Sequence, residues 1–391
     1  VQPPDGNHLE ESGGDGGMIL SDVCEFIVDC PHSTAPDEGK GYPLIRTPNV
    51  GKGRLDLNGV HRVSESVYKQ RIQRGAPRAN DLIFAREAPA GNVALVQENQ
   101  TVCLGQRTVL IRPNVQKVNP QYLVYYLLSP KPQYELLGTA NGATVAHINL
   151  PAIRNLKIEL PEKSVQDKIG TILVTYDDLI ENNQRQIKLL EEAAQRLYKE
   201  WFVDLRFPGH ENTKIVDGVP EGWSRTNINE ILTFHRGYDL TKNEMKAGRY
   251  PVVGSTTVIG YHNEFKIKGP GIVTGRSGSL GKYQFIWDNF WPHNTSLYIS
   301  DYKDHNIFFV YSLLQTVDFA SLNNGGAIPT LNRNVLSNIE VIEPTDELQE
   351  MFAKIAEPQY QKIKNLEKQN DKLKTARDLL LPKFMSGEVE V

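Results

Sequence analysis

The feature that most constrains the fold of this chain is an internal repeat. Residues 142–202 align without a gap with residues 325–385, and identical residues recur in one register along the whole alignment. Upstream the match is looser but stays in order, with residues 82–96 resembling residues 272–286. Chance matches do not keep one register that long, so the chain consists of two copies of one unit. The identical pairs include Gln166/Gln349, Asn155/Asn338, Pro161/Pro344, Ile172/Ile355 and Ile180/Ile363.

The second half of each copy has the pattern of a long helix in a coiled coil. Apolar residues follow at steps of three and four, with one stutter at 172–176–180 in the first copy. Between 162 and 204 there is no proline and Gly170 is the one glycine, which favours a continuous helix. The predicted seam consists of Ile169, Ile172, Ile180, Asn183, Ile187, Leu190 and Leu197 in the first copy and Ile355, Ile363, Leu366, Asn370, Leu373 and Leu380 in the second.

Each predicted helix has one asparagine on its seam. The repeat aligns Asn183 with Leu366 and Asn370 with Ile187, so the two asparagines occupy seam positions one helical turn apart in the aligned copies. If a pseudo-two-fold axis relates the copies, the helices run antiparallel, and Asn183 can face Asn370. That register also pairs Ile169 with Phe384 and Trp201 with Phe352. Our hypothesis is that the asparagine pair fixes the register, as single buried asparagines do in coiled coils. The alternative is two independent surface asparagines.

The variable parts of the two copies mix short β-rich runs with apolar stretches that suit helices, a pattern that favours α+β domains. The predicted fold is two globular α+β domains, related by a pseudo-two-fold axis and separated by a long antiparallel two-helix coiled coil. The predicted segments are a disordered acidic tail (1–17), a first globular domain (18–161), a first spacer helix (162–206), a linker (207–223), a second globular domain (224–344), and a second spacer helix with the C-terminal tail (345–391).

Charge is distributed unevenly along the chain. The net charge is −4, and the acidic residues of the tail account for it. Residues 39–78 carry many more basic than acidic side chains, an excess that can neutralise phosphates. No apolar run approaches the roughly 20 residues of a membrane span, and the N-terminus does not read as a signal peptide, so we expect a cytoplasmic protein without a membrane partner. The three cysteines suit neither a disulfide framework nor a zinc site.

This organisation resembles the specificity subunit of type I restriction-modification systems. The resemblance is carried by the duplicated stretches 142–161 and 325–344, by Gln166 and Gln349 where each helix opens, and by the closing LYKEWF and LLPKFMSG. It implies that each recognition domain reads one half of an asymmetric, bipartite target in double-stranded DNA. It also implies that the helices set the spacing and dock two methyltransferase (modification) subunits. S-adenosylmethionine, ATP and Mg²⁺ are then expected in these and the restriction subunits, with no cofactor, metal or catalytic residue in this chain.

Basic side chains in predicted loops are the candidates for DNA contact, because arginine suits bidentate contacts with guanine or phosphate. For Arg86 and Arg276, at equivalent places in the repeat, the alternative is an internal salt bridge that supports the loop. For the others the alternative is a solvated surface. The candidates are Arg46, Lys52, Arg54, Lys69, Arg71, Arg74 and Arg86 in the first domain and Arg236, Lys242, Lys246, Arg249 and Arg276 in the second.

Two other functional classes stay open at this stage. A stand-alone metal-dependent nuclease would need acidic ligands, which Asp37–Lys40 and Glu244–Lys246 faintly resemble, although such short strings are common by chance. The glycine-rich stretch 275–283 lacks the first glycine of a phosphate-binding loop. A coiled-coil scaffold that binds proteins would show no preference for any DNA sequence.

Overall fold

The computed structural model describes residues 17–140, 146–276, 281–317 and 339–391. Most of the predicted acidic tail and parts of the repeat, 142–145 and 325–338, therefore lie outside the described residues. The chain divides into two compact units: unit 1 comprises 1–183 and 369–391, and unit 2 comprises 184–368. Both units mix helices with strands, so the predicted α+β class is confirmed.

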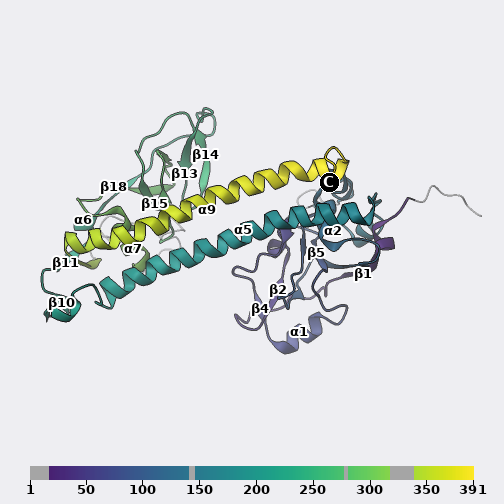
Figure 1. Ribbon diagram of the computed structural model, residues 1–391, viewed down its shortest axis with the longest axis horizontal. Coiled ribbons are helices and arrows are strands. Elements are labelled where there is room, and N and C mark those ends of the chain that lie inside the picture. Colours follow the sequence, from purple (N-terminus) through teal and green to yellow (C-terminus); the bar gives the residue numbers. More distant parts are fainter. Residues whose placement is uncertain (1–16, 141–145, 277–280, 318–338) are drawn as a thin grey trace, which may run out of the picture. The chain divides into compact units, whose positions relative to one another are not determined.

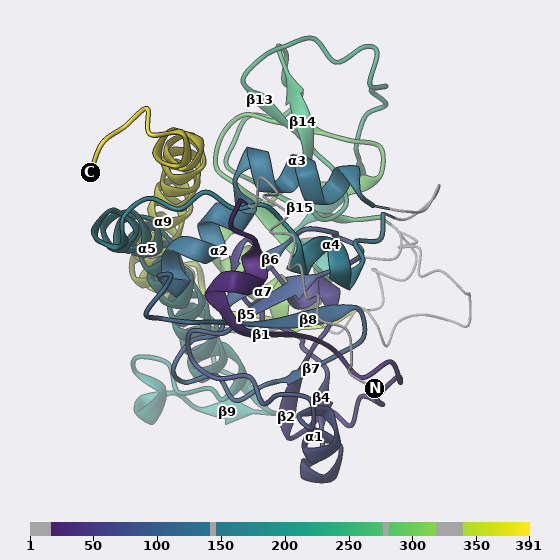
Figure 2. The ribbon, with the colours of Figure 1, turned by 90° about the vertical axis from the view of Figure 1, so that its right-hand side faces the viewer.

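Unit 1 contains two sheets. The larger has the strand order β1-β8-β5-β6-β3, and the smaller has the order β4-β2-β7. Every residue of β5 is fully buried, and α2 packs beside β6 (Figure 2). The strands are β1 (Cys24–Asp29), β2 (Tyr42–Ile45), β3 (Gly53–Arg54), β4 (Arg62–Val63), β5 (Leu82–Ala85), β6 (Val93–Leu95), β7 (Cys103–Leu104) and β8 (Thr108–Pro113). The short helices are α1 (Glu65–Arg71), α2 (Pro120–Leu128), α3 (Pro130–Gly138) and α4 (Leu150–Arg154).

Unit 2 repeats this plan with one strand fewer in the larger sheet, as far as the structure describes it. Its sheets have the orders β12-β18-β15-β16 and β14-β13-β17, and β11 pairs with β19. The strands are β9 (Ile215–Val216), β10 (Val219–Pro220), β11 (Ser224–Asn227), β12 (Thr233–Arg236), β13 (Tyr250–Val253), β14 (Val258–His262), β15 (Gly271–Gly275), β16 (Tyr283–Ile286), β17 (Trp291–Pro292), β18 (Ser296–Asp301) and β19 (Glu340–Glu343). The short helices are α6 (Ile228–Ile231) and α7 (Ile307–Thr316).

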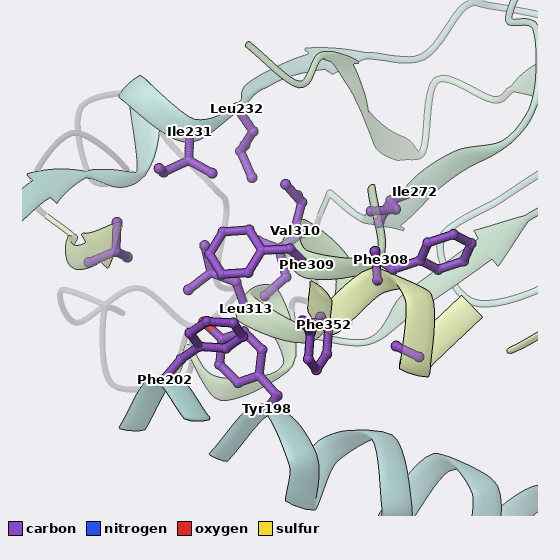
Figure 3. Packing of buried hydrophobic residues seen from close by; sticks show 14 of the residues in the cluster. Tyr198, Phe202, Ile231, Leu232, Ile272, Phe308, Phe309, Val310, Leu313 and Phe352 are labelled. Carbon is purple, nitrogen blue, oxygen red and sulfur yellow. The ribbon is translucent and has the colours of Figure 1, made fainter. Parts of the chain in front are cut away.

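The core of unit 2 is rich in aromatic side chains. Figure 3 shows Phe202, Phe309 and Phe352 converging from three helical segments. The centroid of the Phe202 ring lies 5.3 Å from the ring centroid of Phe309 and 5.4 Å from that of Phe352. Aromatic pairs in tilted or edge-to-face geometry add to the free energy gained from burial alone. The helix end around Phe202 is thereby tied to the rest of unit 2.

Two long helices, α5 (Lys163–Tyr198) and α9 (Asp346–Ser386), each contribute to both units (Figure 1). A π-helical turn (Lys199–Val203) follows α5. The repeated glutamine has the same role at both helix starts: Gln166 Nε2 donates to the carbonyl of Pro161 (2.8 Å), and Gln349 Nε2 donates to that of Pro344 (3.2 Å). Both glutamines are buried. No helix of the described residues is both long and apolar enough to span a membrane.

The predicted register of the two helices is confirmed within each unit. In unit 1, Asn183 Nδ2 donates to Asn370 Oδ1 at 2.9 Å, and both side chains are buried. Ile169 and Phe384 belong to the same hydrophobic core of that unit. In unit 2, the rings of Trp201 and Phe352 lie 6.2 Å apart. The helices therefore run antiparallel where they pair.

One part of the predicted seam is wrong. Ile355 is 44% exposed, and the buried neighbour is Ala356. In the first helix, likewise, Leu173 and Asp177 are buried, whereas Ile172 and Tyr176 are half-buried. The two successive steps of four therefore fall at 169–173–177, one step earlier than the 172–176–180 that the apolar pattern indicated. The reason is that a buried position, 177, holds an aspartate, which a search for apolar residues passes over.

Candidate DNA-binding surfaces

The first candidate surface is the loop that leads from β2 to β3 in unit 1. Backbone bonds between Asn49 and Asp56 and from Gly51 to the carbonyl of Arg54 close it into a tight turn. Lys52 is exposed at this turn, while Arg46 and Arg54 are half-buried. Arg54 forms an ion pair with Asp178 of α5, so its guanidinium is already engaged. Lys52 is the cation of this loop best placed to meet a phosphate.

A buried polar cluster, which sequence analysis missed, holds this loop against the long helices. The hydroxyl of Tyr125 donates to Asp177 Oδ2 at 2.6 Å, and Arg377 of α9 forms an ion pair with the same carboxylate. Gly53 lies against this cluster with φ +92°, and a Cβ there would be 2.7 Å from Asp177 Oδ2. Only glycine tolerates both the backbone conformation and the close approach. No sequence signal joins these residues, because they are far apart along the chain.

The interpretation of Arg71 and Arg86 as DNA-contacting residues is not supported by their placement. Arg71 is 4% exposed, and its guanidinium donates to the backbone carbonyls of Pro31 (3.2 Å) and Ser33. Buried backbone carbonyls need such donors, which accounts for the burial of this arginine. Arg71 therefore ties the segment 31–33 to α1.

Arg86 adopts the internal alternative that the sequence left open. Its Nη1 lies 2.6 Å from Asp29 Oδ2, its Nε donates to the carbonyl of Ile148 (2.9 Å), and its Nη2 lies 2.8 Å from His147 Nε2. The other ring nitrogen of His147 lies 2.6 Å from Glu87. Each of the three guanidinium nitrogens of Arg86 thus has a protein partner, and the arginine supports its loop.

The remaining candidates of unit 1 are on the surface. Lys69 is exposed and pairs with Glu65 at 2.8 Å, one helical turn away. That salt bridge raises the pKa of Lys69, through the hydrogen bond first and the charge second. Arg74 is exposed and donates to the carbonyl of Cys30 at 3.0 Å. An exposed ion pair such as Lys69–Glu65 is weak, so Lys69 can exchange its carboxylate partner for a DNA phosphate.

The candidates of unit 2 are exposed more uniformly. Arg236, Lys242, Lys246 and Arg249 are all exposed, and Arg276 is half-buried. Arg236 lies 3.7 Å from Asp239, and Arg249 lies over the ring of Tyr250 while donating to its hydroxyl at 3.0 Å. Arg276 differs from Arg86, its counterpart in the repeat, in forming no ion pair with the described residues.

One cationic group beside these residues was not found from the sequence. Lys266 Nζ lies 4.7 Å from the ring of Trp291 and 5.9 Å from that of Tyr238. A lysine over aromatic faces is held in place while its ammonium stays available. The three residues are too widely separated along the chain for a sequence pattern to join them.

The acidic strings that resemble nuclease motifs serve as local hydrogen-bond acceptors. Asp37 accepts from the backbone amides of Arg62 and Gly39, which lowers its pKa, the Arg62 bond contributing most. Glu244 accepts from the amide and the hydroxyl of Thr241. Within the described ranges, no group of three or more ligating side chains could hold a metal ion.

Comparison with known proteins agrees with this architecture. The family model described as "Type I restriction modification DNA specificity domain" matches residues 18–192 and again residues 220–375. The "Type I restriction enzyme MjaIX specificity subunit" of Methanocaldococcus jannaschii is 27% identical over 364 residues, covering 85% of this chain and 83% of that protein. The HindI specificity subunit of Haemophilus influenzae is 23% identical over 404 residues, with 80% and 87% covered.

A solved structure extends the likeness to the fold. The crystal structure of a type I restriction-modification S subunit from M. genitalium matches with a TM-score of 0.59 at 17% sequence identity. The match covers 97% of this chain and 98% of that one.

Proposed function

The chain belongs to the family of type I restriction-modification DNA specificity domains, and from this we propose that it is the DNA-reading subunit of a type I restriction-modification complex. Each unit reads one half of an asymmetric, bipartite target in double-stranded DNA. The observation that carries the proposal is that the family model matches the chain twice, over residues 18–192 and over residues 220–375. The chain therefore has two copies of the specificity domain.

We propose further that exposed cations make the electrostatic contacts with DNA. In unit 1 these are Lys52, Lys69 and Arg74, with Arg46 and Arg54 supporting the loop of Lys52. In unit 2 they are Arg236, Lys242, Lys246 and Arg249, together with the half-buried Arg276, and we add the exposed Lys266. Contacts to phosphates supply affinity and fix the register on the duplex, while base contacts supply sequence preference.

The chemistry is assigned to partners in this proposal. Two methyltransferase subunits would bind S-adenosylmethionine and dock on the long helices, and restriction subunits would use ATP and Mg²⁺. The site of action is then the cytoplasm, where the DNA substrate is. The alternatives of a stand-alone nuclease and of a protein scaffold have no observation in their favour.

The test is methylation of a randomised DNA library by this chain together with its cognate methyltransferase subunit, followed by sequencing of the modified positions. A split, non-palindromic motif with a fixed gap is expected. Replacement of residues 18–161 by the corresponding domain of another such subunit should then change one half of the motif only. A continuous motif, or methylation that does not depend on this chain, would contradict the proposal.

A further inference from the structure

The two units differ at one edge of their larger sheets. In unit 1, residues 46–61 connect β2 to β4 and include β3, which pairs in parallel with β6. In unit 2, the equivalent strands β13 and β14 are connected by residues 254–257 alone. Among the strands that the structure describes, β16 pairs with β15 only. The strand position that β3 fills in unit 1 therefore has no counterpart strand in the described part of unit 2.

A groove occupies the corresponding place in unit 2. Its lining includes Tyr283 of β16, Tyr311 of α7 and Tyr360 of α9, and its volume is about 640 Å³. In the repeat, Tyr283 aligns with Val93 of β6, Tyr311 aligns with Tyr125, and Tyr360 aligns with Asp177. Tyr125 and Asp177 are the two residues against which Gly53 of β3 lies in unit 1. The groove is therefore the counterpart of the β3 site.

The charges of the groove favour a basic occupant. Glu191 and Glu192 of α5 line it, and Arg196 is the one cation among its described lining residues. Glu192 lies 3.9 Å from Lys188, whereas Glu191 forms no ion pair with a described residue. Partial burial first, and the neighbouring charge of Glu192 second, raise the pKa of Glu191. A basic side chain placed between these carboxylates would offset both effects. In unit 1 the basic residue after Gly53, Arg54, pairs with Asp178 of α5. The repeat aligns Asp178 with Gln361 of α9, so in unit 2 the carboxylates that could pair with a basic occupant, Glu191 and Glu192, lie on the facing helix instead.

We propose that this groove binds an extended, basic segment of a partner polypeptide, which adds to the edge of β16 as β3 adds to β6. Backbone hydrogen bonds to a sheet edge supply affinity in this mode of recognition, and side-chain pockets supply specificity. A small residue would face Tyr311 and Tyr360, and basic side chains of the segment would reach Glu191 and Glu192 on the other side of the groove. None of the cations that we propose to contact DNA is among the described lining residues of this groove. The proposal of a partner segment therefore does not depend on the proposed reading of DNA.

The chain itself supplies the probe for the test. A fluorescein-labelled peptide with the sequence of residues 49–57, NVGKGRLDL, carries the glycine and arginine of β3. Titration of this peptide with the full-length chain, followed by fluorescence anisotropy, should show saturable binding to one site per chain. Removal of both carboxylates in Glu191→Gln/Glu192→Gln should weaken binding about tenfold or more, as expected for the loss of a charge-assisted hydrogen bond.

Two controls separate the groove from general charge attraction. Glu181→Gln removes an exposed carboxylate of α5 that does not line the groove, and it should leave binding unchanged. A scrambled peptide of the same composition should bind at least about tenfold more weakly. The proposal is overturned if the peptide does not saturate, if the scrambled peptide binds equally well, or if the double variant behaves as the wild type does.

Discussion

At the scale of single residues, the buried carboxylate of Asp177 is the most consequential group in unit 1. It is 3% exposed and receives the hydroxyl of Tyr125 and the guanidinium of Arg377. Asp177→Ala should lower the free energy of unfolding by about 2–3 kcal/mol, because it leaves the buried Tyr125 hydroxyl without its acceptor and the half-buried Arg377 with Asp378 as its remaining ion-pair partner. Urea unfolding measures the loss.

Two comparison variants show whether the pair itself is responsible. Asp178→Ala removes a neighbouring carboxylate that is largely exposed and should cost no more than about 1 kcal/mol. Asp177→Leu/Arg377→Met removes both charges and should recover most of the stability lost in Asp177→Ala. Equal losses for Asp177→Ala and Asp178→Ala would show that Asp177 has no special role.

The three cysteines give a second prediction at this scale. Burial raises the pKa of both Cys24 and Cys103 to about 12, and it also raises the pKa of Cys30. Alkylation requires the thiolate, so at about pH 8 the native chain should react very slowly with iodoacetamide. All three cysteines should react quickly once the chain is unfolded. Mass spectrometry of the labelled chain, with and without denaturant, tests this, and rapid labelling of native Cys103 would contradict it.

The arginines show how far residue roles could be read from the sequence. Local composition identified a basic segment, and most of its cations are indeed at the surface. It could not separate Arg71 and Arg86 from the others, because their partners are backbone carbonyls and an aspartate distant along the chain. Burial of a charge depends on tertiary neighbours, and a single sequence does not contain them.

At the scale of elements, the helices were the most predictable part of the molecule. Their apolar pattern and their repetition predicted α5 and α9 and led to the hypothesis that Asn183 faces Asn370, which the structure confirms. The strand β3 was not predicted, because Gly53–Arg54 has neither the length nor the alternation of a strand. β3 packs against the cluster around Asp177. Because Asp177 is polar, the search for apolar residues also placed this part of the predicted seam one residue away from the buried positions.

The asparagine pair leads to the third prediction. In unit 2 the positions aligned with Asn183 and Asn370 are Leu366 and Ile187. Asn183→Leu/Asn370→Ile should therefore raise the melting temperature by adding apolar burial, while weakening the preference for one register and one association state. Light scattering coupled to size-exclusion chromatography should detect more self-association in the double variant than in the wild type. A double variant that is more stable and as uniform in mass as the wild type would contradict the register hypothesis.

At the scale of the whole molecule, α5 and α9 are the elements shared by both units. If each unit reads one half-site, these helices set the number of unread base pairs between the halves. We therefore expect a change of one or two base pairs in the length of the DNA gap to reduce binding and methylation more than any change in the sequence of the gap. Methylation rates on a panel of gap variants test this expectation.

Lengthening both helices together should shift the preferred gap, which gives the compensating experiment. The boundaries between the units fall after Asn183 in α5 and after Lys368 in α9. Seven residues inserted at each boundary preserve the apolar pattern, and at 1.5 Å per residue they add about 10 Å to the spacer. Base pairs are stacked about 3.4 Å apart, so the preferred gap should grow by about three base pairs. If the lengthened chain folds and methylates the original gap best, the helices do not measure the distance between the half-sites, and the spacing must be set by its partners.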